Sequence, residues 1–331
     1  MTRQGASQMK TSDWFSGFLV ALCFAAANHV AAQNYPGKAI RFIVPVAAGS
    51  GFDVTARMIS ERLAKKFGQP VLVENQPGAG TTLGLATVAR AGPDGYTIGM
   101  MLSPATIQQS LISNMGFDTR KNLAPIILIG WDFNILVVTP SVPVNSVQQL
   151  IDYLKANPDK INYASGGNGT PAHIAAEFFK QSTDTRMVHI PYKAADAAVQ
   201  DLLGDRVQLM FGNVPATQAH IRSGKLRALA IVGKSRLAAL PDVPSMADLG
   251  YPNIDVPNWT GIAAPAGTPA AIISLLHKEI ATVMGDAEVR ERITRGSTVI
   301  DVGSPEMMGK LIVADVARWA EVIRKAGIKG N

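Results

Sequence analysis

The feature that most constrains the fold is the stretch 160–179, KINYASGGNGTPAHIAAEFF. It predicts a short strand at 161–164, a glycine-rich turn at 165–169 and a helix that opens at Thr170, a favourable N-cap followed by proline at the first helical position. Glycines directly before a helix expose backbone N–H groups, and the helix dipole adds partial positive charge, so such a turn can bind phosphate or carboxylate. A tight turn that binds nothing has the same pattern, so this stretch alone leaves both interpretations open.

A second turn of the same design occurs near the beginning of the chain. Residues 39–47, AIRFIVPVA, are a continuous apolar run typical of a strand buried on both faces, and the turn 48–51 leads into a helix predicted from about Asp53. Strand and helix patterns then alternate, and a second round begins near Ile135. This alternation predicts an α/β fold of mainly parallel sheets flanked by helices. Ligands bind at the carboxyl ends of strands in such sheets, so two of these units would offer a ligand one helix N-terminus on either side.

The N-terminal segment has the layout of a secretory signal peptide. Basic residues precede an apolar run at 15–27, and small residues at Val30 and Ala32 suit cleavage before Gln33. The run is shorter than the roughly 20 residues that a membrane span requires. We therefore predict that residues 1–32 are removed during export across the inner membrane and that the mature protein resides in the periplasm.

Composition argues against several kinds of function. The formal charge is +6, but the basic residues are scattered and form no basic helix or aromatic-interleaved run of the kind that binds nucleic acid. The single cysteine, Cys23, lies within the signal peptide, so the mature chain has no disulfide. The remaining histidines are far apart and lack the spacing of metal ligands; they are His173, His189, His220 and His277. We predict neither a metal nor a cofactor.

A series of motifs resembles the periplasmic solute-binding proteins of the tripartite tricarboxylate transporter family, often called Bug proteins. The motifs are YPGKAIRFIVP, AAGSGFDVTAR, GQPVLVENQPGAG, PDGYTI, the stretch 150–179, HIPYKAADAAVQDLLGDRVQLMF and APAGTP. They occur in the family's order and cover essentially the whole chain after the signal peptide. The resemblance implies a two-lobed Venus-flytrap fold of the type II periplasmic class, a small carboxylate ligand and no enzymatic activity. It also implies possible permease subunits as partners, and we expect a monomer.

The resemblance places the ligand between the first glycine turn and the Ser-Gly-x-x-Gly-Thr turn. The first wall would comprise Ala47, Ala48, Gly49, Ser50, Gly51 and Asp53, to which we add Ser103 after the strand 96–102. The opposite wall would comprise Ser165, Gly166, Gly169, Thr170, His173 and Asp196. Each acid could instead be a helix N-terminal residue favoured by the dipole, and His173 could instead be structural.

The chain departs from the family at two positions of this predicted pocket. It has Ala48-Gly49-Ser50 where the family usually has Pro-Gly-Gly, and Ala194 where the family usually has glycine. The ligand therefore stays open among dicarboxylates, tricarboxylates, acidic amino acids and aromatic acids.

Two lobes require the chain to cross between them. We predict that lobe 1 comprises 33–131 and 256–331 and that lobe 2 comprises 132–255. The crossings would lie near 130–134 and 255–260, each close to a tryptophan.

The main alternative is an exported α/β enzyme that binds an anionic substrate or a dinucleotide. Gly78 and Gly80 follow a predicted strand, but the next glycine, Gly84, comes one residue too late for the dinucleotide motif. The acidic residue expected at the end of the following strand is missing from 96–100, and no Gly-x-Ser-x-Gly motif is present.

Overall fold

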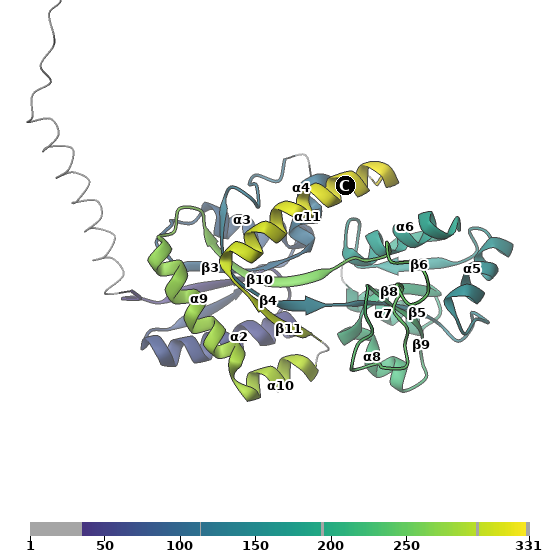
Figure 1. Cartoon of the computed structure of the whole chain (residues 1–331), viewed down its shortest axis with the longest axis horizontal. Helices are drawn as coiled ribbons and strands as arrows, with labels where there is room; N and C mark the ends of the chain where they lie inside the picture. Colours follow the sequence, from purple (N-terminus) through teal and green to yellow (C-terminus); the bar gives the residue numbers. More distant parts are fainter. Residues whose placement is uncertain (1–34, 113, 193–194, 296–297, 329–331) are drawn as a thin grey trace, which may run out of the picture.

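The computed structural model describes residues 35–112, 114–192, 195–295 and 298–328 and has two lobes side by side (Figure 1). The predicted signal peptide, its cleavage site and Ala194 lie outside these ranges. Within them, no helix is both long and apolar enough to cross a membrane.

Lobe 1 is built on a six-stranded sheet with the order β11-β4-β10-β3-β1-β2. Its strands are β1 (Ile40–Val44), β2 (Val71–Asn75), β3 (Thr97–Leu102), β4 (Leu123–Asp132), β10 (Asn258–Pro265) and β11 (Val299–Gly303). Its helices are α2 (Gly51–Phe67), the 3-10 turn η1 (Ala79–Thr81), α3 (Thr82–Arg90), α4 (Pro104–Leu111), α9 (Ala270–Gly285), α10 (Ala287–Arg295) and α11 (Pro305–Ala326).

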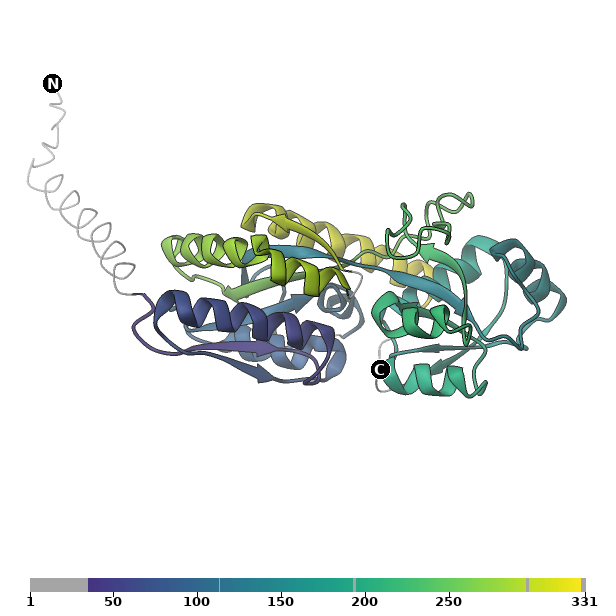
Figure 2. The same ribbon diagram turned by 90° about the horizontal axis from the view of Figure 1, so that it is seen from below.

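Lobe 2 is built on a five-stranded sheet with the order β7-β6-β8-β5-β9. Its strands are β5 (Asn134–Val138), β6 (Asn162–Ser165), β7 (Val188–Pro191), β8 (Leu209–Asn213) and β9 (Arg227–Val232). Its helices are α5 (Val147–Ala156), α6 (Pro171–Thr183), α7 (Ala195–Leu203) and α8 (Val214–Arg222). The view from below separates these two halves along the long axis of the molecule (Figure 2).

The strand directions bring the ends of many strands to the junction between the lobes. In lobe 1, β1, β2 and β3 are parallel, whereas β10, which returns from lobe 2, is antiparallel to both β3 and β4. In lobe 2, β5 leads away from the junction and is antiparallel to β8 and β9, and β6 is parallel to β7 and β8. The carboxyl ends of β1, β2, β3 and of β6, β7, β8 therefore meet at the junction. This is where ligands of open α/β sheets bind.

The two sheets contain more antiparallel strand pairs than the sequence predicted. The expectation holds for β1–β3 and for β6–β8, but every pairing that involves β4, β5, β9, β10 or β11 is antiparallel. The strands β4, β5 and β10 carry the chain from one sheet to the other without a crossover helix. They therefore run antiparallel to their neighbours, whereas strands that are joined by a crossover helix run parallel. The strands β4, β10 and β11 were not predicted from the sequence.

The chain passes between the sheets where the sequence placed the crossings. It leaves lobe 1 between Asp132 and Asn134 and re-enters it at Asn258, the first residue of β10. The boundaries of the two lobes, at 131/132 and 255/256, remain a prediction.

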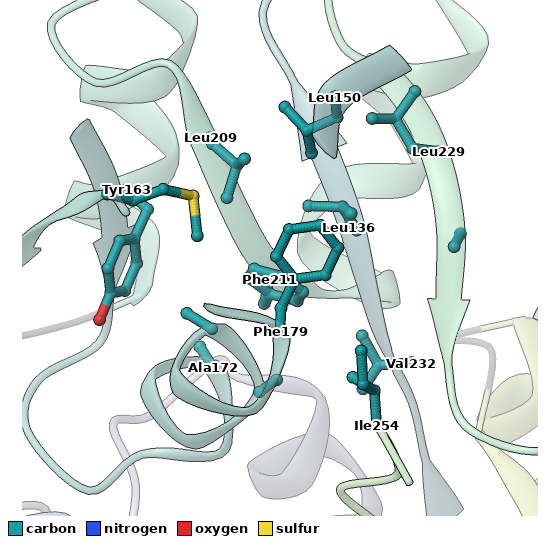
Figure 3. Close-up of a cluster of buried hydrophobic side chains, with 14 of the residues drawn as sticks. Leu136, Leu150, Tyr163, Ala172, Phe179, Leu209, Phe211, Leu229, Val232 and Ile254 are labelled. Atoms are coloured by element: carbon teal, nitrogen blue, oxygen red, sulfur yellow. The ribbon is translucent and has the colours of Figure 1, made fainter. Parts of the chain in front are cut away.

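One buried cluster of lobe 2 lies between its sheet and helices α5 and α6, and another lies between the sheet and helices α7 and α8. Phe179 of α6 packs on Phe211 of β8 with ring centroids 5.7 Å apart, and the Tyr163 hydroxyl points away from these apolar side chains (Figure 3). The same buried cluster includes Trp319 and Ile323 of α11, a helix that otherwise packs on lobe 1. In Figure 1, α11 (yellow) extends from lobe 1 to the edge of lobe 2. The last helix therefore contributes side chains to the core of the other lobe.

Candidate functional site

The lobe-1 turn, residues 47–51, is a helix N-terminus with exposed backbone. Ser50 is the N-cap of α2, and its side chain accepts a hydrogen bond from the backbone N–H of Asp53 over 3.3 Å. Gly49 has a left-handed backbone (φ 85°) that favours glycine, and its N–H donates to Oδ2 of Asp53 over 2.8 Å. Ala47, Ala48, Gly49 and Gly51 are exposed, so backbone groups form the surface of this wall.

Asp53 supports this turn from the inside. It is 2% exposed, Oδ2 also accepts from Nε of Arg57 at 3.0 Å, and Oδ1 accepts from Nδ2 of Asn75 at 2.8 Å. Burial acts to raise the pKa of Asp53, but the hydrogen bonds from Arg57, Gly49 and Asn75 outweigh it and lower the pKa. The carboxylate therefore ties the turn to α2 and β2.

A second glycine turn of lobe 1 lies beside the first one, because β2 is the neighbour of β1. Ala79, Gly80 and Thr81 all have left-handed backbones (φ 47°, 60° and 79°). A Cβ on Gly80 would lie 2.5 Å from Nε2 of Gln108, so the side chain of α4 covers this turn closely. In the sequence, the glycines of this turn match the dinucleotide-binding motif only incompletely.

Ser103 is buried at the junction rather than on an open wall. It is 1% exposed, and its hydroxyl donates to Oδ1 of Asn258 over 2.8 Å. Asn258 in turn donates from Nδ2 to Oδ1 of Asn134 over 3.4 Å. Ser103 thus joins the end of β3 to both crossing segments.

The lobe-2 turn, residues 165–170, connects β6 to α6. Gly167 and Gly169 have left-handed backbones, with φ of 119° and 69°. Thr170 occupies the N-cap position, but its side chain makes no capping bond and donates to the carbonyl of Gly167 over 2.8 Å. A Cβ on Gly166 would lie 3.6 Å from the backbone nitrogen of Ala195, so the N-terminus of α7 adjoins the turn as well.

Ser165 and His173 lie beneath the lobe-2 turn. Ser165 is fully buried, and its Oγ lies 2.7 Å from Nε2 of His189. His173 is 7% exposed, and its Nδ1 accepts a hydrogen bond from the backbone N–H of Gly169 over 3.0 Å. Both predicted ligand residues therefore hold the turn in this conformation, together with His189, which the sequence did not single out.

The lobe-2 turn also touches lobe 1. A Cβ on Gly169 would lie 2.0 Å from Cδ1 of Leu111, and Nε2 of Gln108 donates to the carbonyl of Asn168 over 3.4 Å. Two side chains of α4 therefore pack against this turn at the junction of the lobes. The space beside Gly169 is therefore already occupied by α4.

The predicted site residues therefore fall into two layers. The accessible layer consists of backbone and small side chains: Ala47, Ala48, Gly49, Ser50, Gly51, Gly166 and Thr170. The supporting layer is buried and internally hydrogen-bonded: Asp53, Ser103, Ser165 and His173, with Gly169 against Leu111. Asp196 lies in the first turn of α7, and its side chain is outside the described part of the chain. Among the described residues, no group of three or more His, Cys, Asp or Glu side chains could hold a metal ion.

Comparison with known proteins gives a consistent result. The model of the "Tripartite tricarboxylate transporter family receptor" matches residues 55–328. Protein BugT of Bordetella pertussis is 36% identical over 315 residues, which cover 95% of this chain and 96% of BugT.

Three solved structures are similar in fold and sequence. The periplasmic binding protein BugD is 33% identical with a TM-score of 0.80, covering 90% of this chain and all of BugD. Rpa4515 of R. palustris with adipate is 30% identical with a TM-score of 0.82, covering 90% of this chain and all of Rpa4515. MatC of Rhodopseudomonas palustris with bound malate is 26% identical with a TM-score of 0.78, covering 87% of this chain and all of MatC.

Proposed function

Because this chain belongs to the tripartite tricarboxylate transporter receptor family, a family of periplasmic solute-binding proteins, we propose that it captures a small carboxylate between its two lobes. One observation carries the proposal: each lobe presents a glycine-rich turn and a helix N-terminus at the junction. The solved relatives with adipate and with malate support a dicarboxylate as the first class to test.

Backbone groups supply the chemistry of recognition. N–H groups at a helix N-terminus point outward, and the dipole of the helix favours an anion there. On lobe 1 the guanidinium of Arg57 is already engaged by Asp53 and by Oδ1 of Asn75, so it braces the turn from behind. A carboxylate at 47–51 would be bound by backbone N–H groups and the Ser50 hydroxyl, and a second carboxylate would meet the ends of α6 and α7.

The biological role follows from this chemistry. A periplasmic protein that binds a solute without converting it serves uptake through a membrane permease or sensing, and we propose one of these roles, with the protein acting as a monomer and without enzymatic activity. The family model that matches the chain describes the receptor of a tripartite transporter, which favours a permease as the partner.

Ligand binding is tested by the thermal stability of the purified mature protein in a panel of acids. The panel contains adipate, malate, citrate, glutamate and benzoate, with matched sodium chloride as the control. A ligand that binds only the folded state raises the melting temperature, because it stabilises that state by RT ln(1 + [L]/Kd). Isothermal titration of the best acid should give one site per chain. No shift with any small carboxylate at millimolar concentration would contradict the proposed function.

The location of the site is tested at Gly51. A Cβ at this residue meets no heavy atom within 4 Å, and its backbone is not left-handed, so Gly51→Leu should fold normally. The new side chain would stand at the N-terminus of α2 and exclude a carboxylate from the turn. Gly92→Leu is the matched control, since Gly92 is equally open and lies away from both turns. We expect at least tenfold weaker binding for Gly51→Leu only; equal affinities would place the ligand elsewhere.

A further inference from the structure

Three aromatic rings form a stack behind the lobe-2 turn. The rings of His173 and His189 are 4.2 Å apart and nearly parallel (7°), and Tyr163 stacks on the other face of His189 at 4.7 Å (14°). The rings come from α6, β7 and β6, so the stack joins the three elements that meet under residues 165–170. The middle ring, His189, is only partly buried.

Each histidine holds one of the two left-handed glycines of the turn. Nδ1 of His173 accepts from the N–H of Gly169, whereas His189 contacts Oγ of Ser165, which accepts from the N–H of Gly167 over 3.1 Å and donates to its carbonyl over 3.0 Å. An imidazole nitrogen can accept a hydrogen bond only when it carries no proton. The bond to Gly169 therefore requires a neutral His173 with its proton on Nε2, the nitrogen that lies 4.0 Å from Oε1 of Glu177.

Among the described residues, the charged side chains that act on the two histidine rings, Glu177 and Lys180, belong to α6. Glu177 accepts from the Tyr163 hydroxyl at 2.6 Å and from Lys180 at 2.9 Å, so its charge is shared by two donors. Burial lowers the pKa of His173, and Glu177 opposes this effect while Lys180 adds to it. Burial and the neighbouring His173 lower the pKa of His189 to about 4. Both rings are therefore neutral at neutral pH.

We propose that His173 and His189 are positioning residues that hold the lobe-2 turn in its binding conformation, His173 through its neutral Nδ1 and His189 through its stacking on His173 and its contact with Ser165, and that protonation of His173 releases the turn. The inference rests on the proposed function, because it deepens the role of the same turn. Neither ring needs to touch the ligand: His173 acts through Gly169, and His189 acts through Ser165 and Gly167.

The chemistry of the release is a conflict between two donors. A proton on Nδ1 of His173 would face the N–H of Gly169 across 3.0 Å, so the hydrogen bond would become a repulsive contact. The turn would then have to move, and Gly169 has little room because Leu111 lies against it. Acid therefore weakens ligand binding on the lobe-2 wall while leaving the lobe-1 turn intact.

The first test needs no ligand. NMR spectra of the mature protein give the amide signals of Gly167 and Gly169 between pH 8 and pH 4. We expect both signals to stay constant near neutral pH and then to shift together with the imidazole signals as the pH is lowered into the acid range. In His173→Asn, the amide oxygen replaces Nδ1 as a non-titrating acceptor, so the Gly169 signal should stay constant throughout.

The second test compares affinities for the acid that binds best in the thermal panel. At pH 7.5, His173→Leu should bind at least about tenfold more weakly, because it leaves a buried N–H without a partner, whereas His173→Asn should stay within about threefold of wild type. Below pH 6, the ratio of wild-type to His173→Asn dissociation constants should rise, which separates the protein's titration from that of the ligand. His220→Asn, on α8, removes a histidine away from the stack and controls for general effects.

The outcomes distinguish this inference from the proposed function. A Gly169 signal that titrates equally in wild type and His173→Asn, or equal affinity of His173→Leu and His173→Asn, overturns the inference. If no acid binds the wild-type protein, the proposed function fails, yet the NMR titration still decides whether the histidines control the turn. If acid unfolds the wild type before the signal shifts, unfolding at a lower pH in His173→Asn supports the inference, and an equal midpoint contradicts it.

Discussion

Trp259 donates its indole N–H to Oδ2 of Asp315 over 2.6 Å, and this bond joins the strand that returns from lobe 2 to the last helix of the chain. Both side chains are buried, at 1% and 3% exposure. Burial raises the pKa of Asp315, and the indole N–H opposes that effect. The bond therefore fixes α11 to the crossing strand at a place where water cannot replace either partner.

We expect Asp315→Ala to lower the free energy of unfolding by about 1–3 kcal/mol, because it leaves a buried indole N–H without an acceptor. Urea denaturation followed by circular dichroism measures the change. Asp301→Ala is the matched control, since Trp131 donates to Asp301 in the same way, over 2.8 Å, but in an exposed position. The control should change stability by less than about 0.5 kcal/mol. Equal losses would show that burial does not decide the contribution of these bonds.

The histidine stack makes stability depend on pH. His189 has a pKa of about 4 in the folded protein and an ordinary value of 6.5 when unfolded, so between these values the unfolded chain binds more protons. Stability contributed by His189 is therefore complete above about pH 6.5 and falls as the pH is lowered toward 4. Denaturation midpoints at half-unit pH steps should show a shallower decline for His189→Gln than for wild type. A decline of equal slope in the variant would assign the acid sensitivity to other groups.

Removal of Asp53 should destabilise lobe 1 and abolish binding together. Asp53→Ala deprives Gly49, Arg57 and Asn75 of their acceptor, and we expect a loss of about 2–3 kcal/mol in the free energy of unfolding. Glu61→Ala on the same helix removes an exposed pair with Lys65 at 2.8 Å and should cost less than about 0.5 kcal/mol. An Asp53→Ala protein as stable as wild type would show that the turn does not depend on this carboxylate.

We expect position 169 not to tolerate a side chain, even in the ligand-free protein. Gly169→Ala forces a left-handed alanine and a Cβ into Leu111, so we expect a destabilised protein whose melting temperature falls by several degrees. In the Leu111→Ala background the steric part of the cost disappears and only the backbone strain, about 1 kcal/mol, remains. Additive losses in the double variant would contradict the contact between these residues.

The sequence predicted the elements whose pattern is local. The run 39–47, the glycine turns and the periodic helix after them carry their own signals, and β1, α2, β6 and α6 lie within a few residues of the predicted positions. The strands β4 and β10 were missed because both contain proline or glycine and gain their stability from pairing with each other across more than a hundred residues. Their pairing partners are set by the crossing of the chain between lobes, which no local pattern encodes.

The sequence predicted where the two turns lie, but not which of their residues are accessible and which are buried. Residue type and spacing located both turns, yet they could not separate Ser50, which is accessible, from Ser165, which is fully buried. In the sequence His189 is an isolated histidine, because its contact with His173 depends on α6 and β7 meeting in space. Residue type alone also does not show whether Asp53 contacts a ligand or supports the turn.

The placement of Trp319 and Ile323 in the core of lobe 2 has a consequence for how the protein matures. The strands and helices of lobe 2 are synthesised dozens of residues before these two side chains. An early-emerging lobe 2 would therefore present an unfilled apolar slot beside α6, and the slot closes only when α11 arrives. Lobe 2 therefore has its complete core only after the later-made half of lobe 1 has supplied α11.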